Sequence, residues 1–176
     1  MRTPFDRKTL ASIYLHGNGI EVGALQFPLK LPRSAKVRYV DRLTIPDLRK
    51  HYPELESYKL AKVDILDDGE TLGTIGDATL DFVVANHFLE HCENPIKAVT
   101  NFLRVLREGG ILFLAIPDKR YTFDRKREVT SFHHLFRDYE EGPQSSRNEH
   151  FKDWVTNVEG LKDEERFKDG LKNLKQ

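Results

Sequence analysis

The sequence predicts an α/β protein with an open, mostly parallel sheet of about five strands and helices flanking that sheet. Two observations carry this prediction. Residues 80–118 read without a break as strand, turn, amphipathic helix and second strand. Three shorter apolar runs precede them at intervals typical of alternating strands and helices, and each ends at or near an acidic residue or a glycine.

The three shorter runs are expected to form the first strands, at residues 19–23, 37–40 and 61–65. The segment 25–34 is less helical than a first crossover usually is, because two prolines interrupt it. A short helix is expected between the second and third strands, where Thr44 begins it and Pro53 ends it.

Residues 80–118 form a βαβ unit. The run 80–85 is rich in β-branched and aromatic side chains, as expected of a buried parallel strand. Asn94 caps the following helix, and the glycine pair at 109–110 ends it, since glycine enters the left-handed C-terminal cap without strain. Residues 111–116 form the second strand, which a right-handed crossover joins to the first. Apolar side chains at helical spacing share one face of the helix: Ile96, Val99, Leu103 and Leu106.

The composition limits the functions that are open to this chain. Its 176 residues suffice for one domain with a sizeable core. The 28 basic and 28 acidic side chains balance, which argues against a dedicated nucleic-acid binder. A single cysteine, Cys92, excludes an internal disulfide framework, and no apolar stretch is long enough to span a bilayer. Residues 1–20 lack the pattern of a secretory signal, so a cytoplasmic location is expected.

The character of the chain changes after Asp118. Residues 119–128 are strongly charged, and residues 130–139 carry apolar side chains at helical spacing. A polar turn at 142–148 leads into a very charged segment that is expected to form one or two surface helices. We therefore expect a domain over residues 1–142 and a helical C-terminal extension of it over residues 143–176.

The first candidate site is the turn from Glu21 to Leu25, directly after a strand. Gly23 would let the backbone approach a ligand closely, and Glu21 would bind a cationic amine or a polar tail. The alternative is that Gly23 merely turns the chain. The turn lacks the three-glycine dinucleotide fingerprint, which argues against a nicotinamide enzyme.

The second candidate is Asp41, which ends the second strand about twenty residues after the glycine turn. A carboxylate at this spacing is placed to accept hydrogen bonds from both hydroxyls of a ribose. The alternative is a solvated aspartate that pairs with Arg42. Asp64, at the end of the third run, is a candidate to face an adenine amino group, and a plain loop aspartate is the alternative.

The third candidate is the segment 86–91 at the end of the fourth strand, where ligands bind in open α/β sheets. Its residues His87, Glu90 and His91 also spell H-x-x-E-H, an inverted zinc-protease motif. Because a new helix begins only a few residues later, little helix is available to hold metal ligands. A structural role for His91 is the alternative that we favour.

The fourth candidate is the segment 117–125 at the end of the last strand. Its cations, tyrosine and carboxylates suit a polar or anionic substrate, and the alternative is a solvated charged loop. His133 and His134 follow on the next predicted helix and are candidates for a general base that reaches back to this site.

Together, the acid-x-glycine turn at 21–23, Asp41, Asp64 and the sequences LDFVVANHFLEH and LRVLREGGILFLAIPD resemble the class I S-adenosylmethionine-dependent methyltransferases of the type 11 group. The resemblance covers about residues 19–142 and implies a Rossmann-like fold. The run PDKRYTFDRKREVT followed by HHLFRDYEEG is similar to a bacterial subset found among proteins of glycan assembly.

The resemblance implies that Glu21, Gly23 and Ala24 lie against the methionine part of S-adenosylmethionine, with Asp41 on the ribose and Asp64 near the adenine. Asn86 and His87 would line the pocket beside the sulfonium. The full set of expected cofactor-binding residues is Glu21, Gly23, Ala24, Asp41, Arg42, Asp64, Ile65, Asn86 and His87.

The chain departs from the family pattern in three respects. Leu25 stands where these enzymes commonly have a second glycine, and Pro28 disturbs the helix whose first turn should hold the cofactor. The two strands that normally close the family sheet are not found after Trp154. We therefore expect a reduced or truncated member whose exposed sheet edge favours homo-oligomers.

The function expected from these observations is transfer of a methyl group from S-adenosylmethionine to an oxygen or nitrogen of a small polar acceptor, such as a sugar or glycan precursor. His87, His133 and His134 are the candidate catalytic residues. No metal, nucleic acid or membrane is expected to take part. The first alternative is a non-catalytic binding or scaffold module that keeps the fold, and the more distant one is a zinc hydrolase that uses His87, Glu90 and His91.

Overall fold

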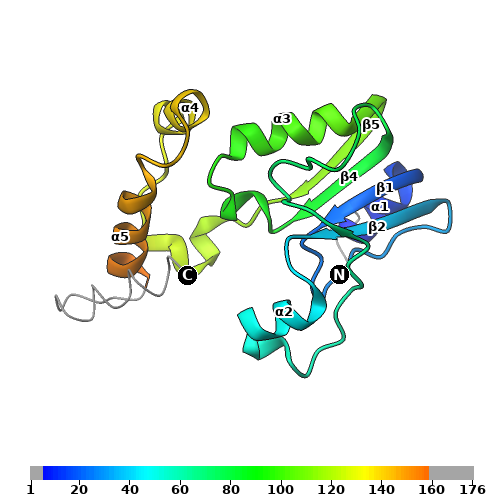
Figure 1. Ribbon diagram of the computed structural model, residues 1–176, viewed down its shortest axis with the longest axis horizontal. Helices are drawn as coiled ribbons and strands as arrows, with labels where there is room; N and C mark the ends of the chain where they lie inside the picture. The colour runs from blue at the N-terminus through cyan, green and yellow to red at the C-terminus, as the bar shows by residue number, and fades with distance from the viewer. Residues whose placement is uncertain (1–5, 159–176) are drawn as a thin grey trace. The chain divides into compact units, whose positions relative to one another are not determined.

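A computed structural model describes residues 6–158 of the chain (Figure 1). The chain divides into two compact units, which we describe separately. The first consists of the chain up to Cys92 together with Lys97–Ile116, and the second of Glu93–Ile96 together with the chain from Pro117 onward. The prediction for residues 143–176 lies partly outside the described residues and stays a prediction.

The first unit contains a five-stranded sheet in which every pair of neighbouring strands is parallel. The strand order is β3-β2-β1-β4-β5, so the predicted fold class is confirmed. Figure 1 labels β2, β1, β4 and β5 in this order. β1 lies in the middle, where Glu21 pairs with Tyr39 on one side and with Val84 on the other. The strands are β1 (Gly17–Val22), β2 (Ala35–Asp41), β3 (Ile65–Leu66), β4 (Leu80–Asn86) and β5 (Leu106–Ala115).

Helices and loops cover both faces of this sheet. On one face, α3 (Pro95–Val105) packs Phe102 and Val105 into a core that includes Ile20 and Val83. On the other face, α1 (Arg7–Tyr14) and the loop 24–34 pack against Phe82 and Val84. Burial of these apolar side chains fixes which residues of β1 and β4 point to each layer.

The helix after β4 begins as predicted, because α3 follows Asn94 and starts at Pro95. Its buried face differs from the prediction. Ala98, Phe102 and Val105 are buried, whereas Leu103 is 57% exposed. Apolar residues occupy more than one face of this helix, and the large ring of Phe102 fills the space above the sheet where Leu103 was expected.

Two element boundaries also differ from the prediction. The third strand spans Ile65–Leu66, which moves its end beyond Asp64. β5 begins at Leu106, so the helix before it ends at Val105 rather than at the glycine pair. The ladder between β4 and β5 is irregular at this point, and Gly109 takes a left-handed φ of +75° there.

Two crossover segments agree with the sequence analysis, and one helix was missed. The loop 24–34 contains no helix, as its two prolines indicated. Thr44 caps α2 (Ile45–His51), and its side chain accepts a hydrogen bond from the Asp47 backbone N–H. The helix α1 before the first strand was not predicted, although Asp6 caps it by accepting a hydrogen bond from the Thr9 backbone N–H.

The described part of the second unit is helical. It contains the short turns η3 (Lys119–Tyr121) and η4 (Phe123–Lys126), and the helices α4 (Phe132–Glu141) and α5 (Arg147–Asn157). Residues 117–158 contain no strand, so β5 is an edge of the sheet in the described chain. No helix within residues 6–158 has the length and apolar content that crossing a bilayer requires.

Candidate functional site

The carboxyl ends of three adjacent parallel strands bring polar residues together in the first unit. The chain leaves β1 toward β2 and β3 on one side and returns to β4 and β5 on the other. The order therefore reverses between β1 and β4, and open α/β sheets bind ligands at such a reversal. Glu21 lies near the end of β1, Asp41 ends β2 and Asn86 ends β4.

Glu21 and Asn86 meet across this reversal. The Asn86 Nδ2 atom donates to Glu21 Oε1 at 3.4 Å, and the backbone N–H of Leu29 donates to both carboxylate oxygens of Glu21 at 3.0 Å. Glu21 is only 1% exposed. Burial raises the pKa of the Glu21 carboxyl to about 7, because it outweighs the two hydrogen bonds that favour the charged form.

The amide of Asn86 is only half satisfied. Its Oδ1 atom is buried and has no hydrogen-bond partner among the described residues. An unpaired buried acceptor costs free energy, on the order of 1–3 kcal/mol. This atom, at the end of β4, therefore has unused acceptor capacity, and a ligand group would have to reach its buried position to donate a hydrogen bond to it.

The turn after β1 is held in a left-handed backbone conformation. Gly23 has a φ of +63°, and a Cβ atom added there would lie 3.4 Å from the ring of Phe88. Leu25 has a φ of +45°, a conformation that glycine adopts more easily than leucine. The leucine therefore keeps the backbone that a glycine at this position would adopt. Ala24 lies between them and is half-buried.

Asp41 lies half-buried at the end of β2, where its Oδ1 atom accepts a hydrogen bond from the Leu43 backbone N–H at 3.2 Å. Burial raises the pKa of its carboxyl above the usual value. The described residues show no ion pair between Asp41 and the exposed Arg42, the arrangement that was the alternative for this residue.

Asp64 is engaged within the sheet. Its Oδ2 atom accepts a hydrogen bond from the Tyr39 backbone N–H at 3.0 Å, and its Oδ1 atom pairs with Lys62 Nζ at 2.8 Å. Ile65 pairs with Val40 and packs against the core. Contact of Asp64 and Ile65 with an adenine stays a prediction, and both residues have structural roles here.

The segment 67–69, which follows β3 directly, was not among the predicted site residues. Asp67 Oδ2 accepts hydrogen bonds from the backbone and hydroxyl of Thr74 at 2.8 and 2.7 Å. Gly69 is buried, and a Cβ atom there would lie 2.5 Å from Val22 and 2.6 Å from Phe88. The acidic loop thus packs against the end of β1. The sequence Asp-Asp-Gly is typical of a turn, and it would have predicted this loop if the third strand had been predicted to end at Leu66.

His87 lies directly after β4 with a φ of +51°, which is strained for a residue with a side chain. Its exposed imidazole Nδ1 atom lies 3.4 Å from Glu90 Oε1, and His91 Nε2 lies 4.0 Å from the same oxygen. The segment Leu89–His91 forms a single 3₁₀ turn. Without a longer helix, His87, Glu90 and His91 do not bring their donor atoms together as metal ligands. Among the described residues, the group whose donor atoms do come together in this way lies in the second unit.

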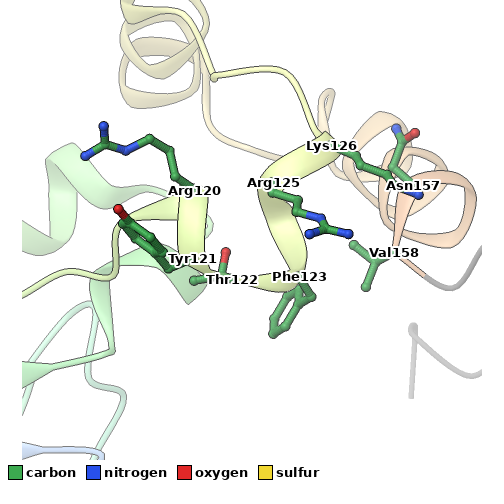
Figure 2. A pocket seen from close by; sticks show the side chains of 8 residues that line it. All are labelled: Arg120, Tyr121, Thr122, Phe123, Arg125, Lys126, Asn157 and Val158. Atoms are coloured by element: carbon green, nitrogen blue, oxygen red, sulfur yellow. The ribbon is translucent and has the colours of Figure 1, made fainter.

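The second unit contains the remaining candidates. His133 is exposed on α4, and the His134 Nε2 atom lies 3.1 Å from Asp138 Oδ2. Residues of the 117–126 segment and the end of α5 line a cavity of about 480 Å³ (Figure 2). The lining residues are Arg120, Tyr121, Thr122, Phe123, Arg125, Lys126, Asn157 and Val158.

Comparison with known proteins identifies the class. Residues 24–114 match the family described as the methyltransferase domain, and the chain belongs to this family. Its members use S-adenosylmethionine, which is the cofactor of this class. The resemblance inferred from the sequence is confirmed at this level.

Individual relatives are more distant. An uncharacterised protein of Methanocaldococcus jannaschii is 30% identical over 121 residues, which are 66% of this chain and 55% of that protein. The chain thus spans about half the length of this curated relative. A methyltransferase structure from Thermotoga maritima, titled a possible histamine N-methyltransferase, is 19% identical with a TM-score of 0.44 and covers 90% of this chain and 63% of that one. One from Methanococcus maripaludis is 16% identical with a TM-score of 0.41, over 91% and 69% of the two chains.

Proposed function

We propose that this protein transfers the methyl group of S-adenosylmethionine to an oxygen or nitrogen of a small polar acceptor. One observation carries the proposal: Glu21, Asp41 and Asn86 lie at the carboxyl ends of three adjacent strands, around the point where the strand order reverses. This is where a doubly wound sheet holds a nucleoside.

The residues present fit an adenosyl group. Asp41 would accept hydrogen bonds from the ribose hydroxyls, which its half-buried carboxylate favours. Asn86 Oδ1, a buried acceptor without a partner in the described chain, would accept a hydrogen bond from the amino end of the cofactor. The left-handed backbone at Gly23 and Leu25 would let the chain pass close to the ligand.

Glu21 has a supporting role in this proposal. Its carboxylate holds the backbone of Leu29 and the amide of Asn86, so it fixes the loop 24–34 and the orientation of Asn86. Such second-layer hydrogen bonds keep a binding site in one geometry. Direct contact of Glu21 with the cofactor would require its buried carboxylate to become accessible.

The sulfonium of the bound cofactor supplies an already electrophilic methyl group, so the protein chiefly aligns the acceptor and excludes water. An acceptor hydroxyl or ammonium must also lose a proton. His87 is the candidate base in the first unit, because Glu90 contacts its Nδ1 atom while Nε2 has no partner among the described residues.

We propose that the acceptor is polar or anionic, with a sugar or glycan precursor as the candidate. The support comes from the cavity in the second unit, whose lining includes three cations, Arg120, Arg125 and Lys126, and the phenol of Tyr121 (Figure 2). Among the described residues, no ion pair or hydrogen bond engages the charged ends of Arg125 and Lys126. Cations with free donors bind carboxylate, phosphate and polyol oxygens.

A transfer assay tests the proposal. The full chain is incubated with S-adenosylmethionine carrying a labelled methyl group and with a panel of sugars, sugar phosphates and small amines. A labelled product that His87→Gln diminishes supports the assigned chemistry. His51→Gln, which changes a histidine on α2, serves as the matched control for His87→Gln. Cofactor binding without any labelled product across the panel would instead favour the non-catalytic scaffold.

A further inference from the structure

We propose that His134, Asp138 and His150 form a binding site for a divalent transition-metal ion, with Zn²⁺ as the fitting ion. The three residues come from two helices of the second unit. His134 and Asp138 are one turn apart on α4, and His150 lies on α5. The proposal concerns the second unit alone and does not depend on methyl transfer.

The three donor atoms are already gathered. His134 Nε2 lies 3.0 Å from His150 Nε2 and 3.1 Å from Asp138 Oδ2, and His150 Nε2 lies 3.8 Å from that oxygen. A zinc ion bonded at about 2.0–2.1 Å to each donor in tetrahedral geometry separates two of its ligand atoms by roughly 3.3–3.4 Å. The three observed distances lie within about 0.5 Å of this separation, so small side-chain shifts would place all three donors on one ion.

Asp138 is oriented as a metal ligand usually is. It is only 2% exposed, and its Oδ1 atom accepts a hydrogen bond from the buried Ser146 hydroxyl at 2.9 Å. Its backbone oxygen accepts a hydrogen bond from Asn94 Nδ2 at 2.8 Å. These contacts leave Oδ2 facing the two imidazoles. Outer hydrogen bonds of this kind fix the orientation of ligating carboxylates.

The buried charge of Asp138 requires compensation. Within the described chain, the side chains paired with it are His134 and His150, and neither lysine nor arginine forms an ion pair with it. Isolated buried carboxylates are costly, and a coordinated cation is one of the few ways to offset that cost.

The part of the second unit that the structure describes, residues 117–158, has little apolar core to hold its helices together. Among residues 117–158, Val155 is the buried hydrophobic side chain, while Phe132 and Val129 are each 74% exposed. A metal ion would bridge α4 to α5 across the turn that joins them. Small units with little core commonly gain folding free energy in this way.

The donor set selects among cations. Two imidazole nitrogens and one carboxylate oxygen suit Zn²⁺ and similar ions, whereas Mg²⁺ and Ca²⁺ prefer oxygen ligands alone. Three protein ligands leave one coordination position of a tetrahedral ion for water or a substrate oxygen. We therefore expect binding of Zn²⁺ and Co²⁺ and no comparable binding of Mg²⁺.

Metal titration of the chelator-treated full chain tests the proposal. Calorimetry with Zn²⁺ is expected to give one site per chain and a higher melting temperature, and Co²⁺ should give the intense visible bands of a tetrahedral ion. His134→Gln, His150→Gln and Asp138→Asn should each weaken zinc binding at least about tenfold. Ser146→Ala, which leaves all three ligands in place, should weaken it by a smaller factor.

Two matched controls separate this site from the other histidines. His133→Gln changes the exposed neighbour on α4, and His91→Gln changes the H-x-x-E-H segment, so both should keep the affinity of the unmodified protein. Circular dichroism verifies that each variant is folded. Absence of stoichiometric Zn²⁺ binding by the unmodified protein would overturn the proposal. Loss of binding in His91→Gln with retention in folded His134→Gln would overturn it as well.

Discussion

Asn86 Nδ2 donates a hydrogen bond to Glu21 Oε1 at 3.4 Å, which links the end of β4 to the end of β1 at the point where the strand order reverses. The same carboxylate accepts the Leu29 backbone N–H, so one buried acid ties two strands and a loop together. This arrangement leaves Asn86 Oδ1 unpaired within the described chain. The candidate site is therefore organised around a buried acid whose charge state depends on pH.

Glu21→Gln should change the pH dependence of stability. The pKa of Glu21 in the folded protein is about 7, above the reference value of 4.5. At pH values between these two, the native state therefore holds a proton on Glu21 that the unfolded state has lost. Stability of the unmodified protein should fall as pH rises from 4.5 to 7 and then level off. The contribution is on the order of 2–3 kcal/mol. Urea unfolding of the unmodified protein and of Glu21→Gln at pH 5 and pH 8 measures this contribution. An equal decrease in the stability of the two proteins from pH 5 to pH 8 would refute the raised pKa of Glu21.

Asp41→Ala should weaken binding of the cofactor. Loss of two charge-assisted hydrogen bonds to ribose costs about 1.5–3 kcal/mol, or roughly ten- to a hundredfold in the dissociation constant. Calorimetric titration with S-adenosylhomocysteine measures the change. Glu54→Ala, which removes an exposed carboxylate elsewhere in the first unit, is the matched control. Equal affinity of Asp41→Ala and the unmodified protein would show that Asp41 does not hold the ribose.

Gly23→Val should reduce cofactor affinity at least as much as Asp41→Ala. A β-branched residue is strained at a φ of +63°, and its Cβ atom would approach Phe88 to 3.4 Å. The turn would then move away from the ligand. The same titration gives the affinity, while thermal unfolding separates a local effect from loss of the fold. Retained affinity in a folded Gly23→Val would contradict close approach of the backbone.

His87→Gly should stabilise the protein while lowering methyl transfer. Glycine relieves the left-handed strain at a φ of +51°, and the exposed imidazole contributes little packing. The net gain in the free energy of unfolding should be about 0.5–1 kcal/mol. His87→Asn, which also tolerates this conformation, serves as the comparison. A His87→Gly variant with full transfer activity would exclude His87 as the base.

The sheet edge leads to a prediction about assembly. β5 has a neighbouring strand on one side in the described chain, and a free edge presents unpaired backbone groups to a second copy. Sedimentation of the full chain should therefore show a dimer whose dissociation constant rises when Leu112→Pro removes one edge donor and breaks the strand. A concentration-independent monomer would contradict this prediction.

Much of the fold was predictable because its signals are local. The strand predicted at 80–85, the start of the helix after Asn94 and the cap at Thr44 follow from short patterns, and the structure confirms them with the strand one residue longer. Capping by the Asn94 side chain stays a prediction. The end of β3 was not predictable in this way, since Ile65 and Leu66 are strand residues only through pairing with β2. Because the strand was predicted to end near Asp64, Asp64 was the predicted strand-end acid, whereas Asp67 is the acid that follows β3.

The site was predictable only in outline. Strand ends pointed to Glu21, Asp41 and Asn86, because parallel strands bring their carboxyl ends to one edge. The burial of Glu21 and the hydrogen bond it accepts from the Leu29 backbone N–H depend on how the loop 24–34 folds back onto the sheet. No local sequence pattern predicts that arrangement. The approach of His150 to His134 likewise depends on helix packing, and the sequence analysis did not identify it.

Calorimetric titration of the full chain with S-adenosylmethionine tests the central claim most directly, because it asks whether the strand ends around Glu21, Asp41 and Asn86 hold an adenosyl group. We predict saturable one-to-one binding and an increase in melting temperature, both reduced in Asp41→Ala. Absence of heat and of any thermal shift at millimolar ligand would contradict the account.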